Sequence, residues 1–252
     1  MIEVYATRIP AGNKLSRLTS LLSFMQGKKG KRIRNFYHKE DAARALAGEW
    51  LARTVISKKL NIPLENIRFK TNANGKPYLL GRNKIHFNIS HSGKWAVCAF
   101  GEKPAGIDIE EISTVNLEIA RRFFSAEECF DLFSKKADER LLFFYELWTL
   151  KESFIKAAGK GLSIPLSSFT IKISSQRSPT GCRQISDTVG NPCMIQGIST
   201  DSRSNNKKRG SNILPDISKY NFRQYSIDKN YKMAVCSTES SFSPDIVKLQ
   251  MV

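Results

Sequence analysis

A short internal repeat limits how this chain can fold more than any other feature of its sequence. The pentapeptide KWAVC at residues 94–98 returns as KMAVC at residues 232–236. In each case we expect a late strand that follows a long helix, and the two helices carry Trp50 and Trp148 at similar places. We therefore predict an α+β protein with a pseudo-duplication: two similar halves, each a small, mostly antiparallel sheet packed on a long helix.

The second predicted half is longer than the first. We place the boundary between residues 104 and 105, so that the halves are 1–104 and 105–252. Residues 174–219 hold much of the extra length and are rich in Ser, Asn, Gly and basic residues. That composition is typical of a mobile surface insertion.

Hydrophobic spacing predicts the main elements. Apolar residues recur at three- and four-residue steps over 40–60 and again over 138–158, which indicates two helices with one buried face each. Ser125 and Glu128 have the spacing of a capping box and predict a further helix start. Strands are expected at 84–90, 94–100, 105–110 and 167–173.

Composition excludes several classes of protein. The chain has 5 cysteines, an odd number without a CxxC pair, and only 3 histidines, which argues against a disulfide framework or a zinc site. No apolar run is long enough to cross a bilayer, and the first residues lack the layout of a secretory signal. We therefore expect a cytoplasmic protein that does not act at a membrane.

The charge is concentrated in the first half. Residues 1–104 contain 20 Lys and Arg but 6 Asp and Glu, whereas 105–252 contain 20 against 17. A run of basic residues at 28–34, followed by Arg44 and Lys76, adds a local cluster. Such a field attracts phosphate-rich ligands, nucleic acid or acidic proteins. A merely solubilising surface is the simpler alternative.

Two carboxylates lie together in the sequence GIDIE. Asp108 and Glu110 are two residues apart on a predicted strand, so their side chains share a face while Ile107 and Ile109 face the core. Adjacent carboxylates repel unless a cation lies between them, and oxygen ligands favour Mg²⁺ or Mn²⁺ over zinc. An ordinary amphipathic edge strand is the alternative.

Two other motifs offer polar side chains. Glu152 and Lys156 lie one helical turn apart, either as a surface ion pair or as a metal carboxylate beside a phosphate-binding lysine. In residues 88–93, Ser90, His91 and a turn with exposed NH groups suit a phosphate. A Ser-His nucleophile pair is disfavoured because adjacent strand residues face opposite sides.

Four motifs, in this order, resemble the surfactin-synthetase-activating type of 4′-phosphopantetheinyl transferase. They are FNISHSG, GIDIE, RFFSAEE and WTLKESFIKAAGKGLS. FYHKEDAAR near the start belongs to the same pattern. The resemblance implies a monomer with one active site in the cleft between two α+β halves. It implies transfer of 4′-phosphopantetheine from coenzyme A to a serine of an apo carrier protein, with Mg²⁺ (or Mn²⁺) and release of 3′,5′-ADP. The carrier would be peptidyl, acyl or polyketide, as in nonribosomal peptide and antibiotic biosynthesis.

The resemblance also implies roles for individual residues. The metal ligands would be Asp108, Glu110 and Glu152. The coenzyme A contacts would be Ser90, His91 and Arg44, with Lys29 and Arg32 from the basic run, and Lys76 and Lys156 on other phosphate oxygens. His91, Arg44, Lys29 and Arg32 would share the 3′-phosphate. The catalytic residues would be Glu152 as the base for the serine proton, Lys156, and Glu128 near the metal.

Two rival functions make different predictions. A Mg²⁺-dependent phosphodiesterase or nuclease would hydrolyse phosphate esters without an acceptor protein. A non-catalytic nucleic-acid-binding module would show a steeply salt-dependent affinity for DNA or RNA. No helix-turn-helix, zinc finger or aromatic RNA-binding motif accompanies the basic run, so we expect no nucleic-acid partner.

Overall fold

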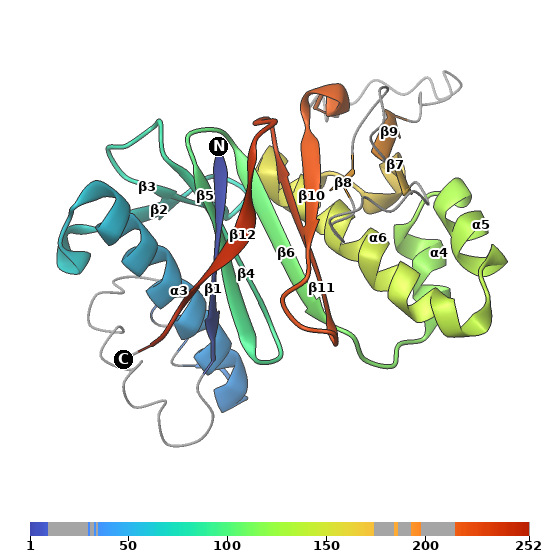
Figure 1. Ribbon diagram of the computed structural model, residues 1–252, viewed down its shortest axis with the longest axis horizontal. Helices are drawn as coiled ribbons and strands as arrows, with labels where there is room; N and C mark the ends of the chain where they lie inside the picture. The colour runs from blue at the N-terminus through green and yellow to red at the C-terminus, as the bar shows by residue number, and fades with distance from the viewer. Residues whose placement is uncertain are drawn as a thin grey trace.

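Two four-stranded sheets form the centre of the molecule (Figure 1). The computed structural model describes residues 1–9, 30, 33, 35–173, 184–185, 193–197 and 215–251. The first sheet has the strand order β12-β1-β5-β4 and the second β6-β11-β10-β8. The strands of the first sheet are β1 (Ile2–Arg8), β4 (His86–Ser92), β5 (Trp95–Gly101) and β12 (Phe242–Leu249). The strands of the second sheet are β6 (Ala105–Glu111), β8 (Gln184–Ile185), β10 (Asn221–Tyr225) and β11 (Tyr231–Ser237).

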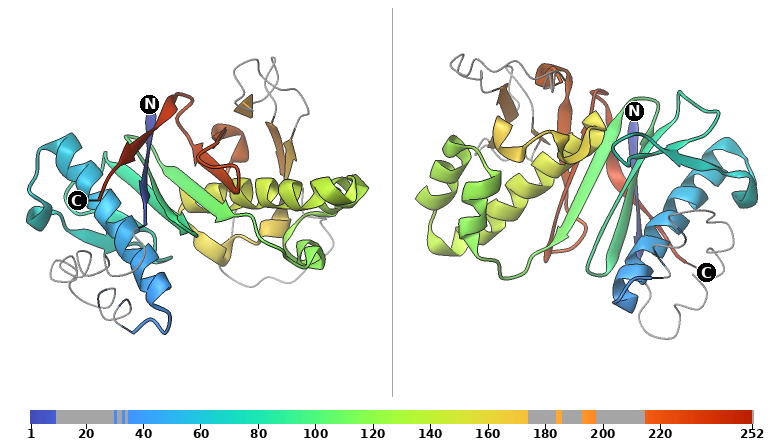
Figure 2. Two further views of the ribbon diagram at one scale, coloured as in Figure 1. Left: turned by 60° about the horizontal axis from the view of Figure 1, so that its bottom comes forward. Right: turned by 180° about the vertical axis from the view of Figure 1, so that it is seen from behind.

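Helices cover the outer faces of both sheets. The helices are α3 (Lys39–Leu60), α4 (Ala120–Phe123), α5 (Ala126–Ser134) and α6 (Ala137–Ala158). Two two-stranded sheets complete the fold. One pairs β2 (Phe69–Thr71) with β3 (Pro77–Leu79), and the other pairs β7 (Phe169–Ile173) with β9 (Cys193–Gly197). In Figures 1 and 2, α3 and α6 lie on opposite sides of the strands. The α+β class and both long helices are confirmed.

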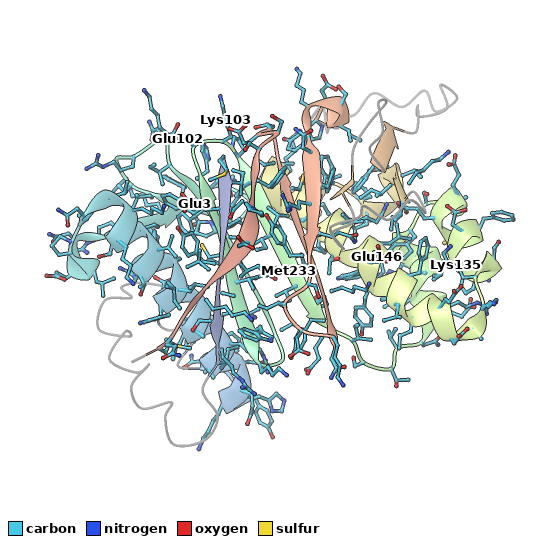
Figure 3. All side chains as sticks on the ribbon, in the orientation of Figure 1. Glu3, Glu102, Lys103, Lys135, Glu146 and Met233 are labelled. Carbon is cyan, nitrogen blue, oxygen red and sulfur yellow. The ribbon has the colours of Figure 1, made fainter. Side chains whose placement is uncertain are left out.

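The hydrophobic core has three main parts. One cluster lies between the sheets and joins Val4 and Val97 to Ile107 and Val235. Met233 belongs to it and lies among the central strands in Figure 3. The other two lie under α3 and under α6. Burial on both faces explains why β5 reads as a nearly continuous apolar run.

The last strand returns to the first sheet. β12 pairs in parallel with β1, from Ile2 opposite Phe242 to Thr7 opposite Leu249. These residues therefore lie with the first sheet although they follow the predicted boundary at residue 104. No helix in the described parts of the chain is long and apolar enough to cross a membrane.

The predicted insertion is only partly a loop. Within 174–219 the structure describes β8, β9 and a 3₁₀ turn at Ile217–Lys219. β9 pairs with β7, and β8 pairs with β10, so these parts of the predicted insertion belong to the sheets. The rest of the segment, up to residue 214, lies outside the described residues.

Candidate active site

The paired carboxylates of β6 face helix α6. Ile107 and Ile109 are fully buried between the sheets, so Asp108 and Glu110 share the other face, as predicted. Helix α6 can approach this face because residue 106 is glycine: a Cβ there would collide with the backbone of Ser153 and Ala157. The strand alternation and one glycine thus bring the carboxylates to α6.

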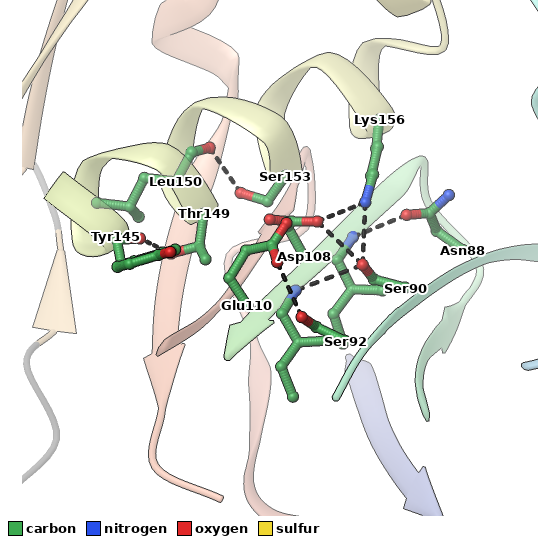
Figure 4. Close-up of polar contacts among 12 residues, drawn as sticks. Asn88, Ser90, Ser92, Asp108, Glu110, Tyr145, Thr149, Leu150, Ser153 and Lys156 are labelled. Carbon is green, nitrogen blue, oxygen red and sulfur yellow. Dashed lines mark hydrogen bonds and ion pairs between the residues drawn. The ribbon is translucent and has the colours of Figure 1, made fainter. Parts of the chain in front are cut away.

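Lys156 joins the two halves at this point (Figure 4). Its ammonium lies 2.5 Å from Oδ1 of Asp108 and donates to Oγ of Ser90 at 3.1 Å. The Ser90 hydroxyl donates to the same Asp108 oxygen at 2.9 Å. Asp108 is 3% exposed, and its second oxygen, Oδ2, is buried without a hydrogen-bond partner among the described residues. One unsatisfied carboxylate oxygen is therefore available for a ligand.

The other two predicted ligands hold their protons more tightly than usual. Burial and the neighbouring Asp108 raise the pKa of Glu110 to about 7, and a hydrogen bond from Ser92 opposes the shift. Burial also raises the pKa of Glu152, with a smaller contribution from Asp108. Like charges close together in a partly buried site produce shifts in this direction. The three carboxylates predicted as a set are thus neighbours.

The donors are of the kind that Mg²⁺ prefers, since they are carboxylate oxygens without nitrogen or sulfur. In the described part of the chain, however, no three His, Cys, Asp or Glu side chains are arranged to hold an ion as they stand. The position of Lys156 gives a physical reason, because its ammonium already contacts Asp108. The contact occupies Oδ1 of Asp108, whereas Oδ2 has no partner among the described residues.

The predicted phosphate-binding residues form a second group on α3 and β4. Burial lowers the pKa of His91, and the nearby cations of Lys156 and Arg44 lower it further. Arg44 is paired with Asp41 at 2.5 Å on the same helix. Lys29 and Arg32 lie outside the described residues. The structure thus brings His91 and Arg44 together beside the carboxylate cluster.

Lys76 has a different position from the one expected of a phosphate ligand. Its ammonium donates to the carbonyl oxygens of Ala105 (2.9 Å), Lys156 (2.5 Å) and Ala157 (3.2 Å). Asn72 and Asn74 from the same turn donate to the carbonyl of Gly159. The last carbonyls of a helix have no partner within it. This turn of the first half therefore caps the C-terminal end of α6.

Glu128 is also separate from the carboxylate cluster. It completes the predicted capping box with Ser125, and its carboxylate accepts from Lys151 at 2.5 Å and from the NH of Ile171 at 2.7 Å. Glu128 and Lys151 are 1% and 0% exposed. Both carboxylate oxygens are thus occupied away from Asp108, because Ser125 uses Oε2 and the other two use Oε1. The contacts point to a structural role instead of the predicted place near the metal.

The sequence prediction places Ser92 at the phosphate-binding turn but gives no role to it, to Asn88 or to Lys151. Lys151 lies next to Glu152 in the chain but on another face of α6, and a buried lysine has no distinct sequence signal. Asn88 and Ser92 alternate with Ser90 on β4. Their period of two, on a strand whose other face is apolar, is a signal that could have identified them.

Comparison with known proteins defines the class of protein to which this arrangement belongs. Residues 104–236 match the family model of the 4′-phosphopantetheinyl transferase superfamily, and residues 13–103 match that of the 4′-phosphopantetheinyl transferase N-terminal domain. The chain therefore belongs to the 4′-phosphopantetheinyl transferase family, and it is a transferase. The resemblance seen in the sequence is confirmed.

Individual relatives cover most of the chain. The 4′-phosphopantetheinyl transferase Sfp of Bacillus subtilis is 41% identical over 225 residues, which are 89% of this chain and 87% of the relative. The 4′-phosphopantetheinyl transferase ffp of Bacillus subtilis is 39% identical over 91% of this chain and 89% of its own length. The 4′-phosphopantetheinyl transferase psf-1 of Bacillus pumilus is 38% identical over 94% of this chain and 90% of its own length.

Proposed function

We propose that this chain transfers the 4′-phosphopantetheine group of coenzyme A to a serine of an apo carrier protein and releases 3′,5′-ADP. One observation carries the proposal beyond family membership. Ser90 of the basic half, Lys156 and the carboxylate of Asp108 meet within 3.1 Å at the junction of the two sheets. A phosphate-binding strand and an oxygen-donor site side by side suit cleavage of a pyrophosphate.

Asp108, Glu110 and Glu152 would hold Mg²⁺, with Mn²⁺ as a substitute. The support is the unpartnered Oδ2 of Asp108 and the raised pKa values of Glu110 and Glu152, which burial and the neighbouring carboxylates produce although Lys156 contacts Asp108. When bound, the cation supplies charge neutralisation for the pyrophosphate. Lys156 would then turn from Asp108 to a phosphate oxygen.

The coenzyme A phosphates would bind on the α3 and β4 side. His91 and Arg44 would hold the 3′-phosphate together with Lys29 and Arg32. Ser90 would contact the nucleotide, and Lys76 would reach a phosphate only by leaving its carbonyl partners. Fixed cations that neutralise charge and hold the ester in line account for most of the catalysis in such reactions.

The reaction itself needs one proton acceptor. The carrier serine oxygen attacks the β-phosphorus of coenzyme A, a new P–O bond forms, and the bond to the oxygen of 3′,5′-ADP breaks. Glu152 would take the serine proton. Burial raises the pKa of this carboxyl, so its affinity for a proton is greater than that of an exposed glutamate.

The arrangement of the two halves supports one site per chain. We place it in a cleft between halves 1–104 and 105–252, related by pseudo-duplication. The support is that β4 and β6, one from each sheet, both contribute to the polar cluster. Because one chain supplies both sides, we propose that the enzyme works as a monomer.

Intact-mass spectrometry tests the proposal. The protein is incubated with coenzyme A, Mg²⁺ and, in separate reactions, apo peptidyl, acyl and polyketide carriers. We expect each accepted carrier to gain the mass of one phosphopantetheine and an equal amount of 3′,5′-ADP to form. No gain on any carrier would contradict the proposal. Release of 3′,5′-ADP without an acceptor would instead indicate a hydrolase.

A further inference from the structure

Two unpaired strand edges face each other where the sheets meet. In the described part of the chain, β6 is an edge strand of the second sheet and pairs with β11, while β4 is an edge strand of the first and pairs with β5. Alternate NH groups of an edge strand point away from the sheet and need partners when they are buried. On β6 these are the NH groups of Ile107, Ile109 and Glu111.

Side chains of β4 take the place of a partner strand. The NH of Ile107 donates to Oδ1 of Asn88 at 2.9 Å. The NH of Glu111 donates to Oγ of Ser92 at 3.0 Å. Between them, the NH of Ile109 lies 3.4 Å from Oγ of Ser90. Every second residue of β4 thus accepts from every second NH of β6. We call Asn88, Ser90 and Ser92 the side-chain ladder.

Two rungs of the side-chain ladder also hold carboxylates. The Ser90 hydroxyl donates to Asp108, and the Ser92 hydroxyl donates to Oε2 of Glu110 at 2.9 Å. A hydroxyl can accept and donate at the same time, whereas an amide oxygen only accepts. Serines occur on the rungs beside a carboxylate, and Asn88 lies beside Gly106, which has none. The residue types therefore match what each rung requires.

We propose that Asn88 and Ser92 are positioning residues that fix the register of β6 against β4. They set the distance between the phosphate-binding side and the carboxylates Asp108 and Glu110. Ser92 also orients Glu110 directly. This role rests on the proposed function for its catalytic consequence, but the side-chain ladder itself is tested without any activity measurement.

Hydrogen exchange of single amides, followed by NMR, tests the side-chain ladder. Ser92→Ala should speed exchange of the Glu111 NH at least about tenfold, since it removes this donor's acceptor, and Asn88→Ala should do the same for Ile107. Ser92→Thr retains the hydroxyl and should restore protection. Ser218→Ala, at an exposed serine that bonds locally to Asp216, is the matched control. Unchanged exchange of Glu111 and Ile107 in both alanine variants would overturn the proposal.

Kinetics and cation binding then separate positioning from plain stability. Ser92→Ala should lower kcat about tenfold or more with little change in KM for coenzyme A, and Ser92→Thr should recover most of it. Mn²⁺ affinity of the enzyme without coenzyme A, measured by calorimetry, should fall in Ser92→Ala. If exchange speeds up but kcat and Mn²⁺ affinity stay at wild-type values per folded molecule, the positioning role is wrong. If wild type itself transfers nothing, the proposed function fails while the exchange result stands.

Discussion

The two sheets carry the same kind of buried cation on their long helices. Arg53 of α3 lies three residues after Trp50, and Lys151 of α6 lies three residues after Trp148. Arg53 pairs with Glu49 at 2.8 Å and Lys151 pairs with Glu128 at 2.5 Å, with every partner at most 4% exposed. A buried cation with a carboxylate partner is thus common to both halves.

The surroundings of the two cations are also alike. Arg53 lies over the ring of Phe69 and donates to the carbonyl of Ile67, and Lys151 lies over the ring of Phe169 and donates to that residue's own carbonyl. Each ring follows a 3₁₀ turn that begins at the leucine of a triplet IPL, which occupies residues 62–64 and 164–166.

The halves differ on the face of the sheet that packs against the long helix, which is α3 for the first sheet and α6 for the second. In the first sheet Thr7 is paired with Ala96, the third residue of the repeated pentapeptide. In the second sheet Asp108 is paired with Ala234, which has the same place in the repeat. The scaffold cations are therefore shared, whereas the carboxylate is present in one half. We infer that the features common to both halves serve stability and that the carboxylate found in one half serves the proposed chemistry.

The largest expected effect tests that division. Asp108→Asn keeps the shape of the side chain but removes the charge that the cluster offers to a cation. We expect transfer to fall on the order of 10³-fold or more, measured as phosphopantetheine gain on an apo carrier. Circular dichroism should show an unchanged fold.

Thr7→Val is the matched control in the first half. The Thr7 hydroxyl is buried with no partner among the described residues, so its removal costs no hydrogen bond that the structure shows. We expect wild-type transfer in this variant. A loss of transfer as large as that of Asp108→Asn would contradict the inference that only the carboxylate position of the second half takes part in the chemistry.

The shared cations give the next largest effect, on stability. Lys151→Met removes the cation that pairs with the buried Glu128. Arg53→Met removes the cation that pairs with the buried Glu49. Each should reduce the free energy of unfolding by about 3–5 kcal/mol, measured by urea denaturation. Adding Glu128→Gln to Lys151→Met should recover part of the loss. A stable single variant would show that the pair is dispensable and would break the parallel between the halves.

The structure also shows which parts of this arrangement were readable from the sequence. Helical periodicity placed α3 and α6, and strand alternation placed Asp108 opposite Ile107 and Ile109, because these patterns are local. The pentapeptide repeat predicts two similar units, and the IPL triplets at residues 62–64 and 164–166 are a second repeat of the same kind. The alternation of Asn88 with Ser90 was also present in the sequence.

Long-range contacts could not be read in the same way. The family resemblance implies a phosphate oxygen as the partner of Lys76, yet in the structure its partners are carbonyls of Ala105 and of the end of α6. The resemblance implies a place near the metal for Glu128, whereas in the structure its carboxylate pairs with Lys151. The return of β12 to β1 joins the two ends of the chain. Local spacing carries no information on which distant groups satisfy a buried charge or strand edge.

Lys76 offers a smaller effect that tests the contact between the halves. Burial lowers its pKa from 10.5 to about 8. Between these values the unfolded chain holds the proton and the folded chain releases it, so this group makes stability rise with pH through that window. The gain is at most about 3.5 kcal/mol, at about 1.4 kcal/mol per pKa unit.

Urea unfolding of wild type and Lys76→Met at several values between pH 7.5 and 10 measures this gain. Wild type should gain stability relative to Lys76→Met as the pH rises. Lys70→Met, at an exposed lysine of the same hairpin, should follow wild type. A pH-independent difference between wild type and Lys76→Met would show that the ammonium is not desolvated at the end of α6.

The smallest expected effect concerns the phosphate side of the first half. Arg44→Ala removes one cation beside His91 and should weaken coenzyme A binding about tenfold, or about 1.4 kcal/mol, in calorimetry at fixed salt. The loss should be much smaller with 3′-dephospho-coenzyme A, because the cation's partner is then missing. Lys58→Ala, at an exposed lysine on the last turn of α3, makes the same charge change and should leave both affinities unchanged. Equal losses with both ligands would show that Arg44 does not bind the 3′-phosphate. An equal loss of affinity in Lys58→Ala would show that the effect of Arg44→Ala comes from the general positive charge of the first half.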